Sequence, residues 1–339
     1  MKYLDIKIAD RIEEKLSKLN DLRPLPWSAL KKIQDHFRIE MTYNSNAIEG
    51  NSLTLKETFL VINEGITVKG KPLKDHLEAR DHYLTLNYLY DLVENDKHNT
   101  ISEHLIRSIH QLIMQETDKE WAGAYRNANV IISGTDYIPP DALEVKHKMK
   151  RLIDWIKYNK SNLNIIELAA LFHHKLVYIH PFFDGNGRTS RIIMNLFLMQ
   201  YGFPLVIILR NDRKKYYNVL SQADNDNYRP LVQFIAQSVE RSLVLFIKTL
   251  TPVSKKREKY LTLAQLTSKV PYSAKYLNLL VRQGKLEAHK EGRNWLSSED
   301  AIKRYIDSRE RKRMHKSKLF CSIEYKNISV IPVFLKNVA

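Results

Sequence analysis

Apolar residues recur at helical spacing through the first three quarters of this 339-residue chain. A first helix is predicted over residues 2–19 by apolar residues three or four apart, namely Leu4, Ile8, Ile12, Leu16 and Leu19. Pro24 and Pro26 then interrupt the pattern, and Ser28 is suited to cap a second helix that reaches about Met41. The same periodicity predicts further helices over residues 73–94, 141–158, 164–177, 185–202, 212–223 and 229–250.

Two further apolar runs, outside the ranges above, open with the spacing of a capping box, in which a hydroxyl residue stands three positions before Glu. These are Thr54 with Glu57, and Thr100 with Glu103. The helix over 185–202 is almost wholly apolar after Arg191, so we expect it to be buried on all sides at the centre of a helical core.

The segment from Gly123 to Pro140 departs from the helical pattern. It holds three consecutive β-branched residues over 130–132, then Ser133 and Gly134, then Tyr137 and Ile138. Runs of this kind on either side of a turn predict a β-hairpin. The sequence therefore predicts a mainly α fold with one hairpin.

Composition places the chain among ordinary globular proteins, with 44% hydrophobic and 27% charged residues. It has no run of 18 apolar residues, so no transmembrane helix is expected. The first residues mix charge with apolar positions, so no signal peptide is expected. The single cysteine, Cys321, excludes disulfides within the chain, and a reducing cytoplasm is the expected compartment.

The net charge of +16 is distributed unevenly. Residues 253–318 contain 18 basic and 7 acidic residues, a net charge of +11. Such a concentration indicates a separate basic module whose default partner is nucleic acid. We expect a helical domain over 1–252, with its core at about 100–250, a linker over 253–259, the basic module over 260–318, and a tail over 319–339.

One stretch, HPFFDGNGRTSR at residues 180–191, combines several groups that act on phosphates. Gly185 and Gly187 let backbone amides turn toward an anion at the start of a helix. Arg188 and Arg191 are three residues apart, so both guanidinium groups lie on one face of the first turn. Asp184 is a hard oxygen ligand suited to Mg²⁺, and His180 is a base with a pKa near neutrality. Together they predict phosphoryl or nucleotidyl transfer.

Simpler interpretations apply to parts of this stretch. A histidine before proline is often structural, and Asp-Gly-Asn-Gly alone is a common turn sequence. His173 and His174 lie near His180, but no carboxylate or thiolate completes a zinc site at ligand spacing. The combination over twelve residues favours the functional interpretation.

The stretch resembles the Fic family signature, His-x-Phe-x-Asp/Glu-Gly-Asn-Gly-Arg-x-x-Arg, at every fixed position, and the resemblance extends over about 40–250. It implies a helical fold and transfer of AMP from ATP to a protein hydroxyl. His180 would then deprotonate the target hydroxyl, and Asp184 would hold Mg²⁺ against the phosphates. The amides of Gly185, Asn186 and Gly187, with the Asn186 side chain, would bind the α- and β-phosphates. Arg188 and Arg191 would orient the β- and γ-phosphates.

The same resemblance assigns roles to two flanking segments. The hairpin over 123–140 resembles the Fic flap, which covers the nucleotide and pairs with an extended target segment. Its candidate nucleotide-lining residues are Ser133, Gly134, Thr135 and Asp136. The segment after Asp212 resembles the part that supplies an aromatic residue to the adenosine pocket, and Tyr216 is chosen over Tyr217. Many relatives place Asn eight residues later, where this chain has Asp224.

Residues 45–51, SNAIEGN, resemble the Fic inhibitory motif Ser/Thr-x-x-x-Glu-Gly/Asn. The resemblance implies that Ser45, Glu49 and Gly50 belong to an N-terminal inhibitory helix. Glu49 would pair with Arg191 and withdraw that arginine from the γ-phosphate. The simpler alternative is a helix end with Gly50 as its C-cap, which leaves Glu49 without a role.

The basic module resembles an excisionase- or MerR-like winged helix over about 260–308. Its second helix and the following turn carry side chains suited to DNA, and the candidates are Lys275, Tyr276, Asn278, Arg282, Lys290 and Arg293. The alternative is a protein-docking or dimerisation module, and a homodimer is left open.

We therefore expect a Fic adenylyltransferase that uses ATP and Mg²⁺, is inhibited by Glu49, and is joined to a small winged-helix domain. One alternative is removal of AMP by the same site, and another is a DNA-binding regulator that only senses nucleotide. Phosphate transfer is less favoured, because the relatives that catalyse it carry Lys where this chain has Gly187. The target protein is not readable from the sequence.

Overall fold

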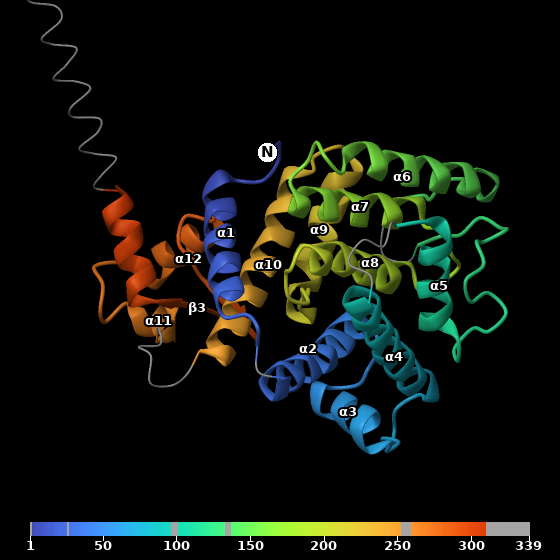
Figure 1. The fold of residues 1–339 in the computed structure, drawn as a ribbon, viewed down its shortest axis with the longest axis horizontal. Helices are drawn as coiled ribbons and strands as arrows, with labels where there is room; N and C mark the ends of the chain where they lie inside the picture. The colour runs from blue at the N-terminus through green and yellow to red at the C-terminus, as the bar shows by residue number, and fades with distance from the viewer. Residues whose placement is uncertain (1, 26, 96–100, 133–136, 252–258, 310–339) are drawn as a thin grey trace, which may run out of the picture. The chain divides into compact units, whose positions relative to one another are not determined.

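The computed structural model describes residues 2–25, 27–95, 101–132, 137–251 and 259–309 (Figure 1). The chain divides into two compact units, residues 1–257 and 258–339. The first unit is helical. In chain order its elements are α1 (Ile6–Asp21), α2 (Trp27–Ile48), α3 (Leu55–Phe59), η1 (Leu60–Glu64), α4 (Leu73–Asn95), α5 (Glu103–Met114), η2 (Ala142–Glu144), α6 (Val145–Asn159), α7 (Ile165–Ile179), α8 (Asn186–Gln200), η3 (Arg210–Asp212), α9 (Arg213–Asp224) and α10 (Arg229–Leu250).

Helix α8 is the centre of the first unit. It packs against α7 over its length, and α5, α4 and α2 also contact it (Figure 1). Every residue from Arg188 to Met199 is buried, as the apolar run after Arg191 predicted. A second layer forms where α1, α7 and α9 pack on α10. Helix α10 is long and apolar enough to cross a membrane by length and composition, but 67% of its apolar window is buried within the unit, as in the core helix of a folded domain.

The ends of several helices follow the local sequence signals. The Thr54 hydroxyl accepts from the backbone N–H of Glu57, whose carboxylate accepts from the Thr54 N–H, so the predicted capping box is present. Asn164 caps α7. At α5 the prediction is wrong by two residues, because Ser102 is the cap and accepts from the N–H of Leu105. Thr100 lies outside the described residues.

Helix α2 extends beyond its predicted end. The expected helix ran from Ser28 to about Met41, whereas α2 continues to Ile48. No proline or glycine interrupts residues 27–48, and the side chains of Thr42, Asn44, Ser45 and Asn46 are buried against the rest of the unit. Tertiary contacts therefore override the weak helix propensity of this polar stretch. As a result, α2 carries Ser45 on its last turn and Glu49 directly after its end.

The described residues 123–132 and 137–140 contain no paired strands, so they do not form the hairpin that was predicted over 123–140. Side chains satisfy the backbone instead. Arg126 donates to the carbonyls of Ala128 and Pro140, and Asn129 binds both the Asp141 carboxylate and the Ala142 N–H. These bonds take the place of a cross-strand ladder for the described residues of the segment.

The second unit contains β1 (Tyr260–Thr262), α11 (Leu263–Leu266), α12 (Ala274–Arg282), β2 (His289–Glu291) and β3 (Asn294–Ser298), followed by helical residues 299–309. Its three-stranded sheet has the order β1-β3-β2, and both pairings are antiparallel. Leu263, Leu266, Leu277, Leu280 and Ile302 are buried in its separate core. The predicted pair of helices, the two short strands about a turn and the final helix are all present. Most of the linker, over 252–258, and the tail, over 319–339, lie outside the described residues.

Candidate functional site

The predicted phosphate-binding stretch forms the turn between α7 and α8. His180 ends α7 with a left-handed backbone, φ +49°, and its N–H donates to the carbonyl of Leu176. The Asn186 side chain accepts from the N–H of Phe182 at 3.0 Å and donates to the carbonyl of the same residue at 2.8 Å. It thereby closes the turn. In this structure both polar atoms of the side chain make bonds within the loop, and its contact with phosphate stays a prediction.

Gly185 turns the chain into α8 with φ +74°. A Cβ at this position would lie 2.9 Å from the Sδ of Met114 and 3.2 Å from Nε2 of His110. Glycine is therefore required both by the backbone angle and by the close approach of α5. The first turn of α8 then carries the amides of Asn186 and Gly187, while the Gly185 N–H donates to the Asp184 carboxylate. The positive end of the helix dipole favours an anion there.

His180 is positioned to act as a base. Burial lowers the pKa of its imidazole to about 4, although the nearby carboxylates of Glu49 and Asp184 act in the opposite direction. The ring is therefore neutral at pH 7 and able to accept a proton. Its backbone carbonyl accepts from Nε of Arg126 at 2.8 Å, and the Arg126 N–H donates to the carbonyl of Pro181.

Arg126 is a buried residue beside the site that the sequence did not single out. Its side chain is almost completely buried and donates to the backbone carbonyls of Ala128, Pro140 and His180. It thus ties both sides of segment 123–140 to the loop that holds the base. Arginine suits this role because its planar group offers five donors in fixed directions.

Asp184 stands at the start of α8 with its carboxylate half-exposed. Its Oδ1 accepts from the N–H of Gly185 at 2.6 Å and lies 3.3 Å from Arg188, and its Oδ2 lies 3.6 Å from Lys74. Burial acts to raise the pKa of this carboxyl, but these positive partners outweigh it and hold the pKa below its usual value. The described residues contain no group of three or more side chains that would hold a metal by themselves. Asp184 is a single hard carboxylate beside the anion site.

Arg188 is buried and enclosed by three groups. Its guanidinium lies 3.2 Å from Glu78 on α4, 3.3 Å from Asp184 and 3.6 Å from the Sδ of Met114. Glu78 is itself buried, and Lys74 lies one turn before it on the same helix. In the sequence, the four-residue spacing of Lys74 and Glu78 on the predicted helix was the signal that these two side chains share the face of α4 that contacts Arg188.

Arg191 contacts the end of α2, as the sequence predicted. Its Nη2 lies 2.7 Å from Oε1 of Glu49 and 2.9 Å from the Ser45 carbonyl, and its Nε donates to the Ser45 hydroxyl. Burial acts to lower the pKa of this guanidinium, but Glu49 outweighs it and the pKa is raised. Gly50 follows with φ +105°, a conformation that favours glycine.

Glu49 also lies directly over the first turn of α8. A Cβ built on Gly187 would clash with Oε1 of Glu49. The carboxylate therefore fills the space beside the amides that would receive an anion. Glu49 is thus placed both to neutralise Arg191 and to obstruct the anion site.

Tyr216, the residue predicted for the adenosine pocket, lies in the core of this structure. Its ring is buried, and its hydroxyl lies 2.6 Å from Nε2 of His173, so it belongs to the core below Arg191. Tyr217 is the exposed neighbour, with 38% of its surface accessible, and the Arg213 guanidinium lies over its ring. Consecutive residues on a helix point about 100° apart, so only packing decides which of the two is buried.

Asp224 lies at the end of α9, where its Oδ1 is 2.9 Å from Nε2 of His174. The carboxylate is therefore engaged by a histidine. The other predicted nucleotide-lining residues, Ser133, Gly134, Thr135 and Asp136, lie outside the described residues.

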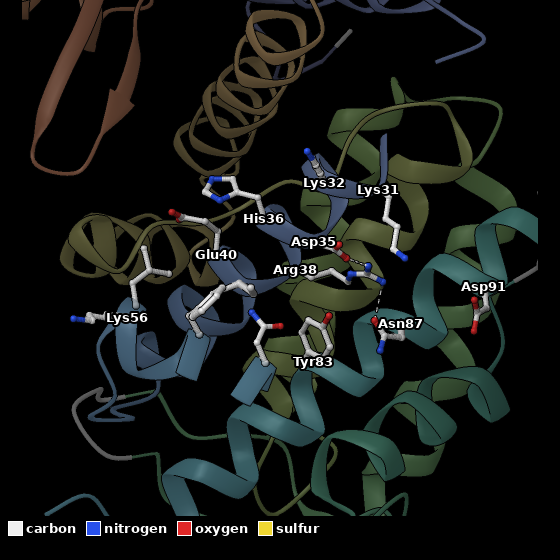
Figure 2. A pocket seen from close by; sticks show the side chains of 14 residues that line it. Lys31, Lys32, Asp35, His36, Arg38, Glu40, Lys56, Tyr83, Asn87 and Asp91 are labelled. Atoms are coloured by element: carbon white, nitrogen blue, oxygen red, sulfur yellow. Dashed lines mark hydrogen bonds and ion pairs between the residues drawn. The ribbon is translucent and has the colours of Figure 1, made fainter. Parts of the chain in front are cut away.

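A separate groove of about 1040 Å³ lies between α2, α3 and α4, and Figure 2 shows its lining. Arg38 crosses its floor, bonded to Asp35 and to Asn87, and Tyr83 lies beside them. None of the residues over 180–191 lines it. The groove is therefore distinct from the site at the start of α8.

In the second unit, the six candidate DNA contacts are not equivalent. Lys275, Arg282 and Arg293 are exposed, and Lys290 lies over the ring of Trp295. Tyr276 instead packs against Tyr272, and its hydroxyl lies 3.3 Å from that of Tyr305. Asn278 is partly buried. Three of the six side chains thus reach solvent freely.

Comparison with known proteins agrees with the geometry of the site. The model of the Fic/DOC family matches residues 100–198, which include the whole stretch from His180 to Arg191. Protein adenylyltransferase Fic of Nematostella vectensis is 36% identical over 266 residues, which are 77% of this chain and 61% of that protein. The chain spans only about half to three fifths of the length of the curated relatives that it matches.

Solved structures that resemble this chain are also Fic proteins. A Fic domain containing signalling protein from Bacteroides thetaiotaomicron is 32% identical with a TM-score of 0.67, and the match covers 74% of this chain and all of that one. Fic-1 of C. elegans is 30% identical with a TM-score of 0.64, over 72% of this chain and 71% of that chain. With the signature stretch, the helical fold and a relative matched over its full length, this chain belongs to the Fic family.

Proposed function

We propose that this chain transfers AMP from ATP to a hydroxyl group of a protein and that Glu49 restrains the reaction. The observation that carries the proposal is the arrangement at the start of α8, where a neutral His180, the half-exposed carboxylate of Asp184 and two buried arginines surround the first turn of the helix. The name protein adenylyltransferase borne by the Nematostella relative supports the same reaction.

In the proposed mechanism, His180 accepts the proton of the target hydroxyl. The oxygen then forms a bond to the α-phosphorus of ATP, the bond from that phosphorus to the bridging oxygen breaks, and pyrophosphate leaves. The first-turn amides of α8 stabilise negative charge on the phosphates, because the donors are fixed before the reaction begins. Arg188 and Arg191 orient the β- and γ-phosphates.

Mg²⁺ fits the carboxylate of Asp184. This ion is usually held by one or two carboxylates together with substrate phosphates and waters, so a single exposed carboxylate beside a phosphate site is sufficient. When bound, it would supply positive charge that neutralises the phosphates.

Phosphate transfer is a weaker alternative on structural grounds. The relatives that the sequence resemblance associates with it carry Lys at the position of Gly187. Here even a Cβ at that position would clash with the Glu49 carboxylate. In the proposed function, the Glu49 carboxylate occupies the space that a side chain at position 187 would need, and it uses that space to inhibit the site.

Removal of AMP by the same site is a second candidate, favoured by one feature of Glu49. Only Oε1 of its carboxylate is bonded to Arg191, and the side chain is 32% exposed. The Oε2 atom accepts no hydrogen bond from the described residues, so it is free to orient a water molecule toward an AMP–protein bond.

The experiment is label transfer with the full chain. Wild type, Glu49→Gly and His180→Ala are incubated with a cell lysate and ATP labelled at the α- or the γ-phosphate. Transfer of the α-label by Glu49→Gly, and none by His180→Ala, supports the proposal. Transfer of the γ-label alone would establish phosphorylation, and transfer of neither label would leave removal of AMP or nucleotide binding alone.

For the second unit, we propose a winged-helix module that contacts DNA through the exposed residues Lys275, Arg282 and Arg293. The support is the net charge of +11 over 253–318 and the arrangement of α11, α12 and the β2–β3 turn. Binding of the full chain to duplex DNA is expected to weaken steeply as salt rises, because each phosphate contact releases counterions. A triple change of these residues to Glu that leaves gel-shift binding unaltered would contradict this proposal.

A further inference from the structure

A buried hydrogen bond joins the inhibitory segment to α4. The Asn51 side-chain amide donates to Oε2 of Glu78 at 2.9 Å and to the backbone carbonyl of Asp75 at 3.0 Å. Both Asn51 and Glu78 are 7% exposed. A buried bond to a carboxylate is among the stronger hydrogen bonds in a protein.

The same carboxylate reaches the catalytic end of α8. Oε1 of Glu78 lies 3.2 Å from Arg188, while Oε2 receives Asn51. Two residues before Asn51, Glu49 binds Arg191. The short segment 49–51 is therefore fastened at both ends to the two arginines of the anion site, directly at one end and through Glu78 at the other.

The residue between these two attachments is Gly50, with φ +105°, and a Cβ added there would meet no heavy atom within 4 Å. Gly50 is exposed, and glycine has the greatest backbone freedom of any residue. The long Glu49 side chain is itself about one-third exposed. The N–H groups of Gly50 and Asn51 donate to the carbonyls of Ala47 and Asn46, and the Asn51 side chain adds a second attachment that holds the segment carrying Glu49.

We propose that Asn51 and Glu78 are positioning residues of the inhibited state, whose hydrogen bond fixes segment 49–51 so that Glu49 stays on Arg191. The inference rests on the proposed inhibitory role of Glu49. The segment has two states, with the Glu49 carboxylate on or off Arg191, and the Asn51–Glu78 bond favours the first. ATP needs a free Arg191, so its affinity reports the balance between the states.

The test measures the affinity of the full chain for a fluorescent ATP analogue by titration. The change Asn51→Ala is made in wild type and in Glu49→Gly. With Glu49 present, we expect roughly tenfold tighter binding, the effect of losing one hydrogen bond to a charged group. Without Glu49, we expect a change of less than about twofold, because the carboxylate that Asn51 restrains is gone.

Thr54→Ala is the matched control. It removes the side-chain cap of α3, three residues further along the same loop, without touching Glu78. Its ATP affinity should equal that of wild type. If Asn51→Ala does not fold, Asn51→Asp keeps the side-chain shape, removes the donor and places a carboxylate against Glu78, so it should tighten ATP binding at least as much.

Equal changes in both backgrounds, or no change with Glu49 present, would overturn the inference and leave Asn51 a purely structural residue. Because the titration reads binding and not transfer, it stands apart from the test of the proposed function. A chain that labels no protein would refute AMP transfer, while the titration would still decide whether Asn51 positions Glu49.

Discussion

Glu49 and Arg191 stand 142 positions apart in the sequence and form an ion pair of 2.7 Å, in which the guanidinium is almost completely buried. The pair places a carboxylate against Gly187, where the first turn of α8 would receive phosphate. Under the proposed function, this pair withholds Arg191 from the γ-phosphate of ATP.

Removal of Glu49 and removal of Arg191 should have different effects on AMP transfer. We expect Glu49→Gly to raise AMP transfer about tenfold or more, since a charge-assisted bond is worth roughly 1.5–3 kcal/mol and each ~1.4 kcal/mol is tenfold. Arg191→Ala breaks the same pair but also removes the group that orients the phosphate, so it should not activate. Transfer of α-labelled AMP to the chain or to a target measures both. If Glu49→Gly transfers AMP no faster than wild type does, this result would contradict the inhibitory role of Glu49.

His180→Ala should abolish transfer while ATP still binds. A positioned base contributes roughly 10²–10⁴-fold to the rate, whereas the phosphate contacts are made by other residues. Single-turnover transfer and ATP titration are measured on the same preparation, in the Glu49→Gly background. A parallel loss of affinity and rate would contradict the assignment of His180 as the base.

Asp184→Ala should remove activity together with its dependence on Mg²⁺. Asp184 is the carboxylate within the turn between α7 and α8, and Glu78 is already paired with Arg188. Transfer rates are compared across a Mg²⁺ titration in the Glu49→Gly background. Full Mg²⁺-dependent activity of the variant would mean that the metal is held elsewhere.

Arg126→Lys should lower both stability and transfer, although it keeps the charge. Lysine cannot donate in three fixed directions, so at least one of the carbonyls of Ala128, Pro140 and His180 loses its donor. Loss of one hydrogen bond costs roughly 0.5–1.5 kcal/mol of stability. Thermal unfolding gives the stability and label transfer gives the rate. The control is Arg151→Lys on the exposed side of α6, which should leave both unchanged.

Stability should fall as the pH drops from about 6.5 toward 4. Burial lowers the pKa of His110 and of His180 to about 4, and that of His173 to about 3. In this range the unfolded chain binds protons at these residues that the folded chain does not, so the free energy of unfolding decreases as the pH falls. Denaturant unfolding at pH 7.5 and 5.0 measures the loss. Replacement of exposed His147 by Ala should leave it unaltered, whereas His173→Asn should reduce it.

The sequence by itself determined whatever depends on neighbouring residues. The helices, the capping box at Thr54 and the turn over 180–191 follow from periodicity, caps and glycines within a few positions of one another. The resemblance of residues 45–51 to the Fic inhibitory motif was also recognisable in the sequence, because its residues lie close together at one helix end.

Apart from the Glu49–Arg191 pair, which the family resemblance implied, only the tertiary structure decided the contacts between distant segments. Packing buried Tyr216 against His173 and left Tyr217 exposed, and it gave the carbonyls of segment 123–140 to Arg126 in place of a strand ladder. It also set Glu78 on Arg188 and Asn51 on Glu78, bonds that join residues 27 or more positions apart. Such partners are selected by the shared core around α8, and no local propensity encodes them.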